Sequence, residues 1–320
     1  MKYRQEPPFC IQVEMTEGCN LYCDFCGLQG VRTKKEKNLK FMTPKLANEL
    51  SLQIARAGWN SRIEFAMHGE PTLNNDMVEI IRAFRSNIPK VHLMITSNGG
   101  GLIKNPHKTI EDLFDAGLNV LALDSYEYVN IVPKILSKLE GAERSFNIHY
   151  YPEERSKSPN SRYPISARNL IVVKDISTAE KGTHSKLNNH CGAAAPLDFS
   201  ASGKKCAKPF REISVRWNGA ISICCNDWRG EYKCGNISKE PIDSIWNGKA
   251  FSIARKFLYN GMRDFSPCYG CNSTSYRIGL LPDKQGKLSL PKPSKKDRKE
   301  VSEFTKGRSF TIKVKREWEK

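Results

Sequence analysis

The chain has 320 residues, of which 39% are hydrophobic, and a formal net charge of +17. This is ample for one large core or two domains, and no apolar stretch approaches the ~18 residues of a membrane span. The N-terminal sequence MKYRQEPPFC lacks the apolar stretch of a signal peptide, so we expect a cytoplasmic protein with no membrane partner. The positive charge either favours a polyanionic partner such as nucleic acid or only keeps the protein soluble.

The first half of the chain alternates short β-rich runs with helical patterns. Predicted strands lie at 10–15, 62–67, 91–96, 119–124, 146–151 and 169–174, and predicted helices at 44–58, 74–87, 107–117 and 129–141. Thr43 and Pro44 form a typical start of the first helix. The alternation indicates an α/β fold with a parallel sheet. Six strands are too few for the usual eight-stranded barrel, which leaves an open, partial barrel.

The alternation of predicted strands and helices ends after residue 175. A polar segment rich in small residues leads to REISVRWNGAISICC at 211–225, where Asn218-Gly219 predicts a two-residue β-hairpin. A helix is predicted at 243–258. Residues 281–320 begin as a Pro/Lys linker and end either as a strand with one basic face or as a disordered basic tail. We therefore divide the chain into a first domain (1–180), a bridge (181–205), a small domain (206–280) and a tail (281–320).

The stretch EGCNLYCDFCGLQG places three cysteines within eight positions, at Cys19, Cys23 and Cys26. A structural zinc site uses four protein ligands, and a disulfide uses two. Three thiolates on one loop leave a metal site or a cubane cluster one ligand short. Disulfides are rare in the cytoplasm, so clustered cysteines more often bind metal there.

The three cysteines, with Phe25 before the third, resemble the signature of radical S-adenosylmethionine enzymes. In that family they hold a [4Fe–4S] cluster whose open iron is chelated by the amino and carboxylate groups of S-adenosylmethionine. The resemblance covers about residues 9–271 and implies a partial (β/α)6 barrel. It also implies reductive cleavage of S-adenosylmethionine to a 5′-deoxyadenosyl radical, driven by an electron donor such as flavodoxin or ferredoxin.

Further motifs follow the predicted strands, where the C-terminal ends of parallel strands build active sites. HGEP at 68–71 is similar to the Gly-Gly-Glu motif of the family, with His68 in place of the first glycine. The resemblance implies that seven residues bind the cofactor: Phe25, Gly69, Glu70, Ser97, Asn98, Asp124 and Ser125.

A second set of cysteines occupies the small domain: Cys206, Cys224, Cys268 and Cys271. Four thiolates can fill a second, auxiliary [4Fe–4S] cluster, and a four-cysteine zinc site is the alternative. The order of these residues resembles the twitch extension, a shorter relative of the SPASM domain. Cys225 could replace Cys224, and Cys234 is a further alternative ligand. Cys10, Cys191, Cys225 and Cys234 are otherwise interpreted as buried small hydrophobic residues.

Several features of the sequence bear on the substrate. Strand alternation makes Glu14 and His149 candidate catalytic residues inside the barrel. The basic segment 31–40, and a tail that combines basic residues with Phe304, Phe310 and Trp318, favour a nucleobase or its appended group in nucleic acid, for example thymine hypermodification in DNA. Maturation of a peptide or protein and oxidation of a small amino sugar are the alternatives. A non-catalytic iron–sulfur protein that binds nucleic acid is a third interpretation.

Overall fold

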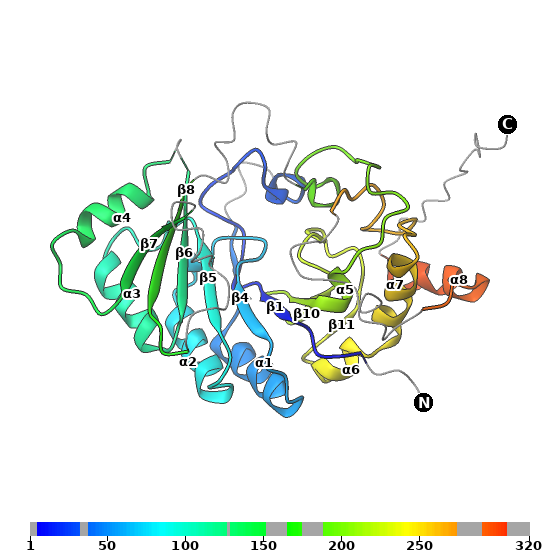
Figure 1. The fold of residues 1–320 in the computed structure, drawn as a ribbon, viewed down its shortest axis with the longest axis horizontal. Coiled ribbons are helices and arrows are strands. Elements are labelled where there is room, and N and C mark those ends of the chain that lie inside the picture. The colour runs from blue at the N-terminus through cyan, green and yellow to red at the C-terminus, as the bar shows by residue number, and fades with distance from the viewer. Residues whose placement is uncertain are drawn as a thin grey trace.

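A nine-stranded sheet forms the centre of the computed structural model, which describes residues 5–32, 38–126, 129–151, 165–174, 188–273 and 290–305. The strand order is β11-β10-β9-β1-β4-β5-β6-β8-β7 (Figure 1). The strands are β1 (Cys10–Val13), β4 (Arg62–Phe65), β5 (Leu93–Ser97), β6 (Val120–Ser125), β7 (Asn147–Tyr151), β8 (Asn169–Lys174), β9 (Glu212–Val215), β10 (Ala220–Ser222) and β11 (Gly235–Asn236). A second small sheet pairs β2 (Thr16–Glu17) with β3 (Lys40–Phe41). The predicted α/β class with parallel strands is confirmed.

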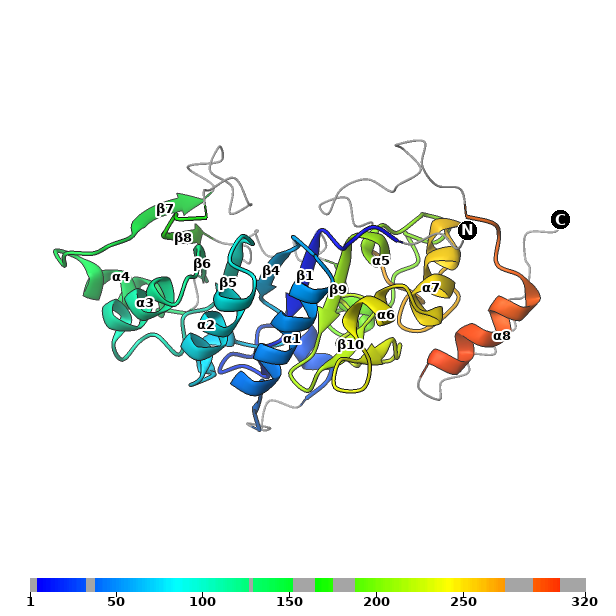
Figure 2. The same cartoon turned by 90° about the horizontal axis from the view of Figure 1, so that it is seen from below.

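Four helices follow one another along one face of this sheet (Figures 1 and 2). They are α1 (Pro44–Arg56), α2 (Met77–Asn87), α3 (Pro106–Asp115) and α4 (Val132–Leu139), close to the predicted ranges. Thr43 begins α1 as expected, because its hydroxyl accepts a hydrogen bond from the amide of Leu46 at 3.3 Å. No helix in the described ranges combines the length and the apolar character needed to cross a lipid bilayer.

The two faces of the strands differ as the alternation predicts. Ile11, Val13, Ile63 and Phe65 are fully buried and belong to the core shared with the helices. Residues of the other parity, such as Gln12, point to the opposite face, which we call the inner face. On β1 and β4 this inner face is polar.

The spatial order of β7 and β8 differs from that of a barrel, in which consecutive strands lie side by side in chain order. β8 lies between β6 and β7 and pairs with both in parallel. The residues explain this order: β8 contains the continuous apolar run Leu170–Val173, which suits a strand with two neighbours. β7 reads Asn-Ile-His-Tyr-Tyr and is only partly buried, which suits the edge of the sheet.

The predicted hairpin joins the main sheet instead of standing apart. β9 pairs with β1 in parallel, with Cys10 opposite Glu212 and Val13 opposite Val215. β10 returns antiparallel beside β9 after a turn in which Gly219 has φ of 80°. β1 therefore lies inside the sheet, with β4 on one side and β9 on the other.

The helices of the C-terminal part depart from prediction in two places. The single helix expected at 243–258 is two helices, α6 (Ile242–Trp246) and α7 (Lys249–Tyr259); a short α5 (Lys208–Arg211) precedes β9. A further helix, α8 (Lys295–Phe304), occupies what was expected to be a linker. Ser294 starts it with a capping box to Asp297, and Val301 of this helix is buried. The basic stretch around Phe310 lies outside the described residues.

Candidate active site

The loop that follows β2 carries the three cysteines of the first motif: Cys19, Cys23 and Cys26. Two backbone hydrogen bonds attach it to the HGEP segment: the amide of Gly18 donates to the carbonyl of His68 at 3.1 Å, and the amide of Glu70 donates to the carbonyl of Gly18 at 2.9 Å. Gly69 permits this approach, because a Cβ atom there would lie 2.2 Å from the carbonyl oxygen of Thr16. The loop is thus fixed at the ends of β1 and β4.

The thiols of this loop suit a metal cluster. The side-chain amide of Asn98 donates to the sulfur of Cys19 at 3.2 Å, and the amide of Leu21 donates to it at 3.3 Å. Burial raises the pKa of Cys19 to about 12 and that of Cys26 to about 11, and the charge of Cys23 adds to both effects. A cationic metal centre favours the thiolate form of such residues and is stabilised by it in turn.

Glu70 forms the centre of a buried hydrogen-bond network that joins the ends of β4 and β5. One carboxylate oxygen accepts from the amide of Thr72 at 2.9 Å, from its hydroxyl at 2.5 Å and from the hydroxyl of Ser97 at 2.5 Å. The other accepts from the amide of Asn98 at 2.7 Å. Burial raises the pKa of Glu70, and these donors oppose the rise. Within the described residues Oε2 has one donor, which leaves capacity for an ammonium group.

Asp124, at the end of β6, has a buried oxygen atom with no partner among the described residues. This atom is Oδ1; the Tyr126 hydroxyl donates only weakly to Oδ2, at 3.4 Å. Burial and the charge of Glu70 raise the pKa of Asp124 to about 7. Two carboxyl groups in one buried corner favour a ligand with positive charge and hydrogen-bond donors, and S-adenosylmethionine has both.

The remaining predicted cofactor residues lie at the same strand ends. The ring of Phe25 packs 5.7 Å from that of Tyr126, which places the cysteine loop beside the end of β6. Ser125 is the last residue of β6 and is opposite Lys174 of β8 in the sheet. The structure thus brings Cys19, Glu70, Asn98 and Asp124 together at the C-terminal edge of the sheet, as the motifs predict.

The second cysteine set is buried in the C-terminal part: Cys206, Cys224, Cys268 and Cys271. The pKa of Cys268 is raised by burial and by the charges of Cys271 and Cys206, and that of Cys224 by burial and by several charges that include Cys268. All four thiols therefore share one region. Four thiolates can ligate a [4Fe–4S] cluster completely, one at each iron. Within the ranges described, no group of three His, Cys, Asp or Glu side chains converges tightly enough to hold one metal ion.

The neighbouring Cys225 points elsewhere. Its sulfur lies 3.3 Å from the ammonium of Lys208, and its amide donates to Glu212 at 3.0 Å. The placement of these two cysteines supports Cys224 as the ligand. Cys234 has Asp227 and Arg255 as charged neighbours, which fits its interpretation as a buried small residue.

His68 connects the two cysteine regions, a role that the sequence did not reveal. It has a left-handed backbone (φ 57°), and its ring is fully buried. Nδ1 lies 2.7 Å from the carboxylate of Glu14, and Nε2 lies 2.9 Å from the carbonyl of Cys225. The residue that departs from the glycine motif therefore joins the HGEP segment to the loop after β10.

Trp228 is a second missed contact between the regions. Its ring lies 4.7 Å from that of His68 and 5.6 Å from that of His190. A Cβ atom on Gly27, next to Cys26, would lie 2.5 Å from the Trp228 ring. Nothing in the local sequence pattern marks this tryptophan, because its partners are far away along the chain.

The two candidate catalytic residues are far apart in the sheet. Glu14 follows β1 and is fully buried, where it binds His68, the amide of Trp217 at 2.9 Å and Arg216 at 3.7 Å. His149 lies on the edge strand β7, beside Asn169 at 3.1 Å. Four strands separate β1 from β7. The contacts of Glu14 are those of a structural role, and a catalytic role of either residue stays a prediction.

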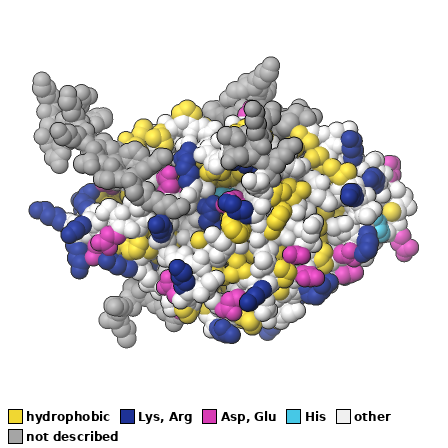
Figure 3. Space-filling view, turned by 180° about the vertical axis from the view of Figure 1, so that it is seen from behind, with side chains coloured by type: hydrophobic (Ala, Val, Ile, Leu, Met, Phe, Trp, Pro, Cys, Tyr) yellow, Lys and Arg dark blue, Asp and Glu magenta, His cyan; other side chains and the backbone are white. Residues whose placement is uncertain are grey.

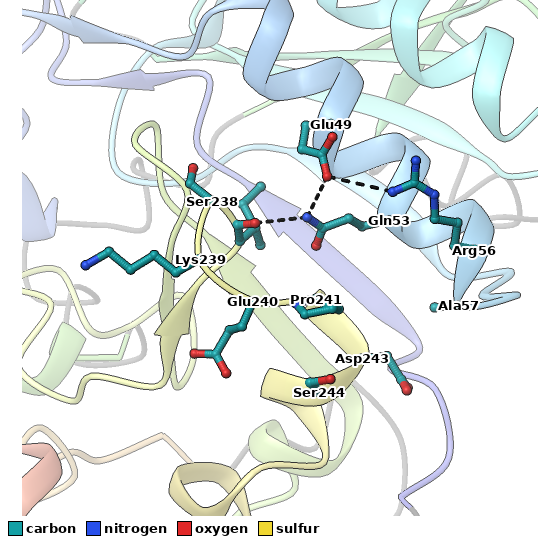
Figure 4. A pocket seen from close by; sticks show the side chains of 11 residues that line it. Glu49, Gln53, Arg56, Ala57, Ser238, Lys239, Glu240, Pro241, Asp243 and Ser244 are labelled. Carbon is teal, nitrogen blue, oxygen red and sulfur yellow. Dashed lines mark hydrogen bonds and ion pairs between the residues drawn. The ribbon is translucent and has the colours of Figure 1, made fainter.

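A cavity of about 700 Å³ lies away from the cysteine regions. Figure 4 shows that its lining comes from the end of α1, with Glu49, Gln53 and Arg56, and from residues 237–244. Gln53 bridges the two sides, because it donates to the carbonyl of Ile237 and accepts from the amide of Ile242, both at 2.9 Å. The end of α1 precedes β4, so the cavity lies near the N-terminal edge of the parallel strands, opposite the edge that carries the motifs.

Comparisons with known proteins agree with this geometry. The radical SAM superfamily profile matches residues 13–144, and the profile of the SPASM iron–sulfur cluster-binding domain matches residues 206–272. The chain is 24% identical over 266 residues to an S-adenosyl-L-methionine-dependent 2-deoxy-scyllo-inosamine dehydrogenase from Niallia circulans, covering 83% of this chain and 93% of the relative.

Other relatives match a smaller part. A probable GTP 3′,8-cyclase from Pyrococcus abyssi is 26% identical over 184 residues, and the chain spans about half of its length. The crystal structure of BtrN in complex with AdoMet and 2-DOIA has a TM-score of 0.58 at 22% identity, over 84% of this chain and 94% of BtrN, and shows a shared fold. The chain is therefore a radical S-adenosylmethionine enzyme with a [4Fe–4S] cluster and an auxiliary cluster in a C-terminal SPASM-like domain.

Proposed function

We propose that this enzyme oxidises a hydroxyl-bearing carbon of a small amino sugar, with the auxiliary cluster as electron acceptor. The observation that carries the proposal is the similarity to the 2-deoxy-scyllo-inosamine dehydrogenase, which covers 83% of this chain and 93% of the relative. A match confined to the first region would support only the shared radical chemistry.

The inner face of the sheet supplies polar groups for such a substrate. Gln12 and Arg62 both bind the carboxylate of Glu64, and the Arg62 and Glu64 side chains remain 13% and 16% exposed. Nearby, Lys208 forms an ion pair with Glu212 at 2.9 Å and remains 12% exposed. Acidic and basic groups that remain accessible suit the amine and hydroxyl groups of an amino sugar.

The other half of the inner face is apolar. Val120, Ala122, Ile171 and Val173 form a separate buried cluster under β6 and β8, with Tyr151 packed against it. The contrast between the halves can orient a substrate that has one apolar ring face and one polar rim.

Oxidation of an alcohol carbon removes a hydrogen atom from carbon, a proton from oxygen and one further electron. When bound, the first cluster with S-adenosylmethionine supplies the radical that takes the hydrogen atom, and the auxiliary cluster supplies the electron acceptor. The chain itself positions the cofactor with Glu70, Asn98 and Asp124. Glu64, whose side chain remains 16% exposed, is the carboxylate of the inner face that we propose takes up the proton, whereas the Glu212 side chain is buried.

The alternative of a nucleic-acid substrate has less support. Residues 33–37 and 306–320, which carry much of the basic charge behind it, lie outside the described residues. On the face shown in Figure 3, Lys and Arg side chains lie mixed with Asp and Glu near the rim, and hydrophobic side chains gather closer to the middle. We retain a flavodoxin or ferredoxin as the proposed electron donor and the cytoplasm as the proposed compartment.

The test is an oxygen-free assay of the reconstituted enzyme with S-adenosylmethionine, reductant and one substrate class at a time. The classes are amino sugars, short DNA and RNA, and peptides. We expect stoichiometric 5′-deoxyadenosine and a product two hydrogens lighter only with an amino sugar, measured by mass spectrometry. Deuterium placed at the oxidised carbon should appear in 5′-deoxyadenosine.

The matched variant combines Cys268→Ala with Cys271→Ala. It should lose product formation but retain uncoupled cleavage of S-adenosylmethionine, because the first cysteine loop remains intact. Product formed only with an oligonucleotide would overturn the amino-sugar proposal and leave the enzyme class unaffected.

A further inference from the structure

Arg32 follows the first cysteine loop, and its backbone is bound to residues of that loop. Its amide donates to the carbonyl of Leu28 at 3.0 Å. Its carbonyl accepts a hydrogen bond from the hydroxyl of Tyr22, next to Cys23, at 3.2 Å. These two contacts bring Arg32 back to the segment that carries the cysteines.

The guanidinium of Arg32 binds the first turn of the same loop. Its Nη2 group donates to the carbonyl of Cys19 and, at 3.2 Å, to the carbonyl of Leu21. A Cβ atom on Gly18 would lie 3.3 Å from Nη1, so the guanidinium also packs against the residue before Cys19. One cation therefore fixes the backbone on both sides of Asn20, where two carbonyl oxygens converge.

The residues that Arg32 holds are those that surround the sulfur of Cys19. The amide of Leu21 donates to this sulfur at 3.3 Å, while the carbonyl of Leu21 accepts from Arg32. The side-chain amide of Asn98 donates to the same sulfur at 3.2 Å. The carbonyl of Cys19 and its sulfur belong to one residue, so the charge of Arg32 lies beside the site of the first cluster.

We propose that Arg32 is a positioning residue of the first cluster: it holds Cys19 and Leu21 in the geometry for metal binding, and its charge raises the reduction potential of the cluster. A guanidinium keeps its charge at every physiological pH. Positive charge and hydrogen bonds beside an iron–sulfur cluster favour its reduced state. Cleavage of S-adenosylmethionine is reductive, so Arg32 favours the state that starts the reaction. This inference does not depend on the identity of the substrate.

The test compares variants of the full-length enzyme with both clusters reconstituted. Arg32→Lys keeps the charge but loses the planar fork, and Arg32→Met loses both. Arg56→Met is the control for net charge, because Arg56 is exposed and lies beside the cavity in Figure 4, away from the cysteine regions.

Two measurements report on the first cluster. Anaerobic redox titration followed by electron paramagnetic resonance gives its midpoint potential. Its signal is the one that S-adenosylmethionine changes, because only this cluster has an iron without a protein ligand. The rate at which a chelator removes its iron reports how firmly the loop holds the cluster.

We expect Arg32→Met to shift the potential to more negative values and to lose iron about tenfold faster, since hydrogen bonds from a charged donor are lost. Arg32→Lys should stay near the wild-type potential and lose iron at an intermediate rate, and Arg56→Met should change neither. If Arg32→Met assembles no first cluster, Arg32→Gln, which keeps N–H donors without the charge, replaces it in the titration.

Two results would overturn the proposal. One is an uncharged variant of Arg32 that holds the first cluster at the wild-type potential, whatever its rate of iron loss. The other is an equal shift of the potential in Arg56→Met, which would show an effect of net charge and not of the position of Arg32.

Discussion

Asp124 and Glu70 place two carboxyl groups in one buried corner at the ends of β6 and β4. Burial and the charge of Glu70 raise the pKa of Asp124 from 3.8 to about 7, and no group within the described ranges donates to Oδ1 of Asp124. In the absence of a ligand, ionisation of Asp124 is unfavourable in the folded state. Asp124 therefore lowers the free energy of unfolding as the pH rises from about 4 to about 7, because the folded protein binds the proton more tightly than the unfolded chain does.

This arrangement predicts the pH dependence of cofactor binding. As the pH rises through 7, Asp124 ionises and becomes a better partner for a cationic ligand, so the affinity for S-adenosylmethionine should increase between pH 6 and 8. Asp124→Asn should reduce the affinity by about tenfold at pH 8, the cost of losing a hydrogen bond to a charged group. Isothermal titration across this pH range measures both effects. Equal pH dependence in the wild type and Asp124→Asn would exclude Asp124 as the cause.

The chemistry of individual residues predicted much of the site. Cysteine spacing identified both metal-binding regions, and the resemblance identified Glu70 and Asn98, which the structure places beside Cys19. The sequence could not predict that His68 connects the two regions, because only the tertiary fold brings Glu14 and Cys225 to this residue.

At the scale of elements, the site consists of loops joined by short contacts. Gly69 lies where the cysteine loop crosses the HGEP segment, and His68 reaches from that segment to the loop after β10. Helices and strands supported by strong periodicity were predicted within a few residues. α8 was missed, because its start in a Pro/Lys-rich stretch resembles a linker, although Ser294 and Asp297 form a capping box.

His68→Gly tests the connector. Glycine relieves the left-handed backbone, worth about 1 kcal/mol, but two buried contacts are lost and Glu14 keeps only Trp217 and Arg216 as partners. We expect a net loss of about 1–3 kcal/mol in the free energy of unfolding, measured with urea. His68→Asn is the control for the backbone, since asparagine tolerates the same conformation. A glycine variant as stable as the wild type would show that the contacts contribute little.

Gly69→Ala tests the crossing of the two loops. The added methyl group would lie within 2.3 Å of the carbonyl oxygens of Thr16 and Gly18, which cannot move without displacing the cysteine loop. We expect reconstituted protein to fall from about eight irons to about four, because only the first cluster is lost. Gly58→Ala is the control: its φ is +68°, unlike that of Gly69, so the backbone there disfavours alanine, but open space surrounds the added methyl group. Full iron content in Gly69→Ala would mean that the loop adapts.

At the scale of the whole molecule, one sheet runs through both cysteine regions. β1 pairs with β4 and with β9, so the strand before the first cluster loop also holds the hairpin before Cys224. The sequence predicted the hairpin but not this pairing, since nothing local specifies which distant edge β9 joins. The position of β8 was missed for the same reason, although its apolar run suits an interior strand.

Because of this shared sheet, we expect the chain to unfold in one transition. Urea unfolding followed by tryptophan fluorescence and by far-UV circular dichroism should give coincident curves. Trp217, Trp228 and Trp246 lie in the C-terminal part and Trp59 in the first part, so the fluorescence weights the C-terminal part, whereas the dichroism signal includes the helices of both parts. Two separated midpoints would show that the regions fold independently in spite of the β1–β9 pairing.

The pairing of β1 with β9 also affects the synthesis of the protein. β1 is the first strand to leave the ribosome, and its second neighbour follows about 200 residues later. At ribosomal rates this delay lasts roughly 10 to 40 s, during which one edge of β1 has no partner strand. An unpaired strand edge is prone to association with other chains. The nascent protein is therefore expected to depend on chaperones, and insertion of both clusters is expected to follow release from the ribosome.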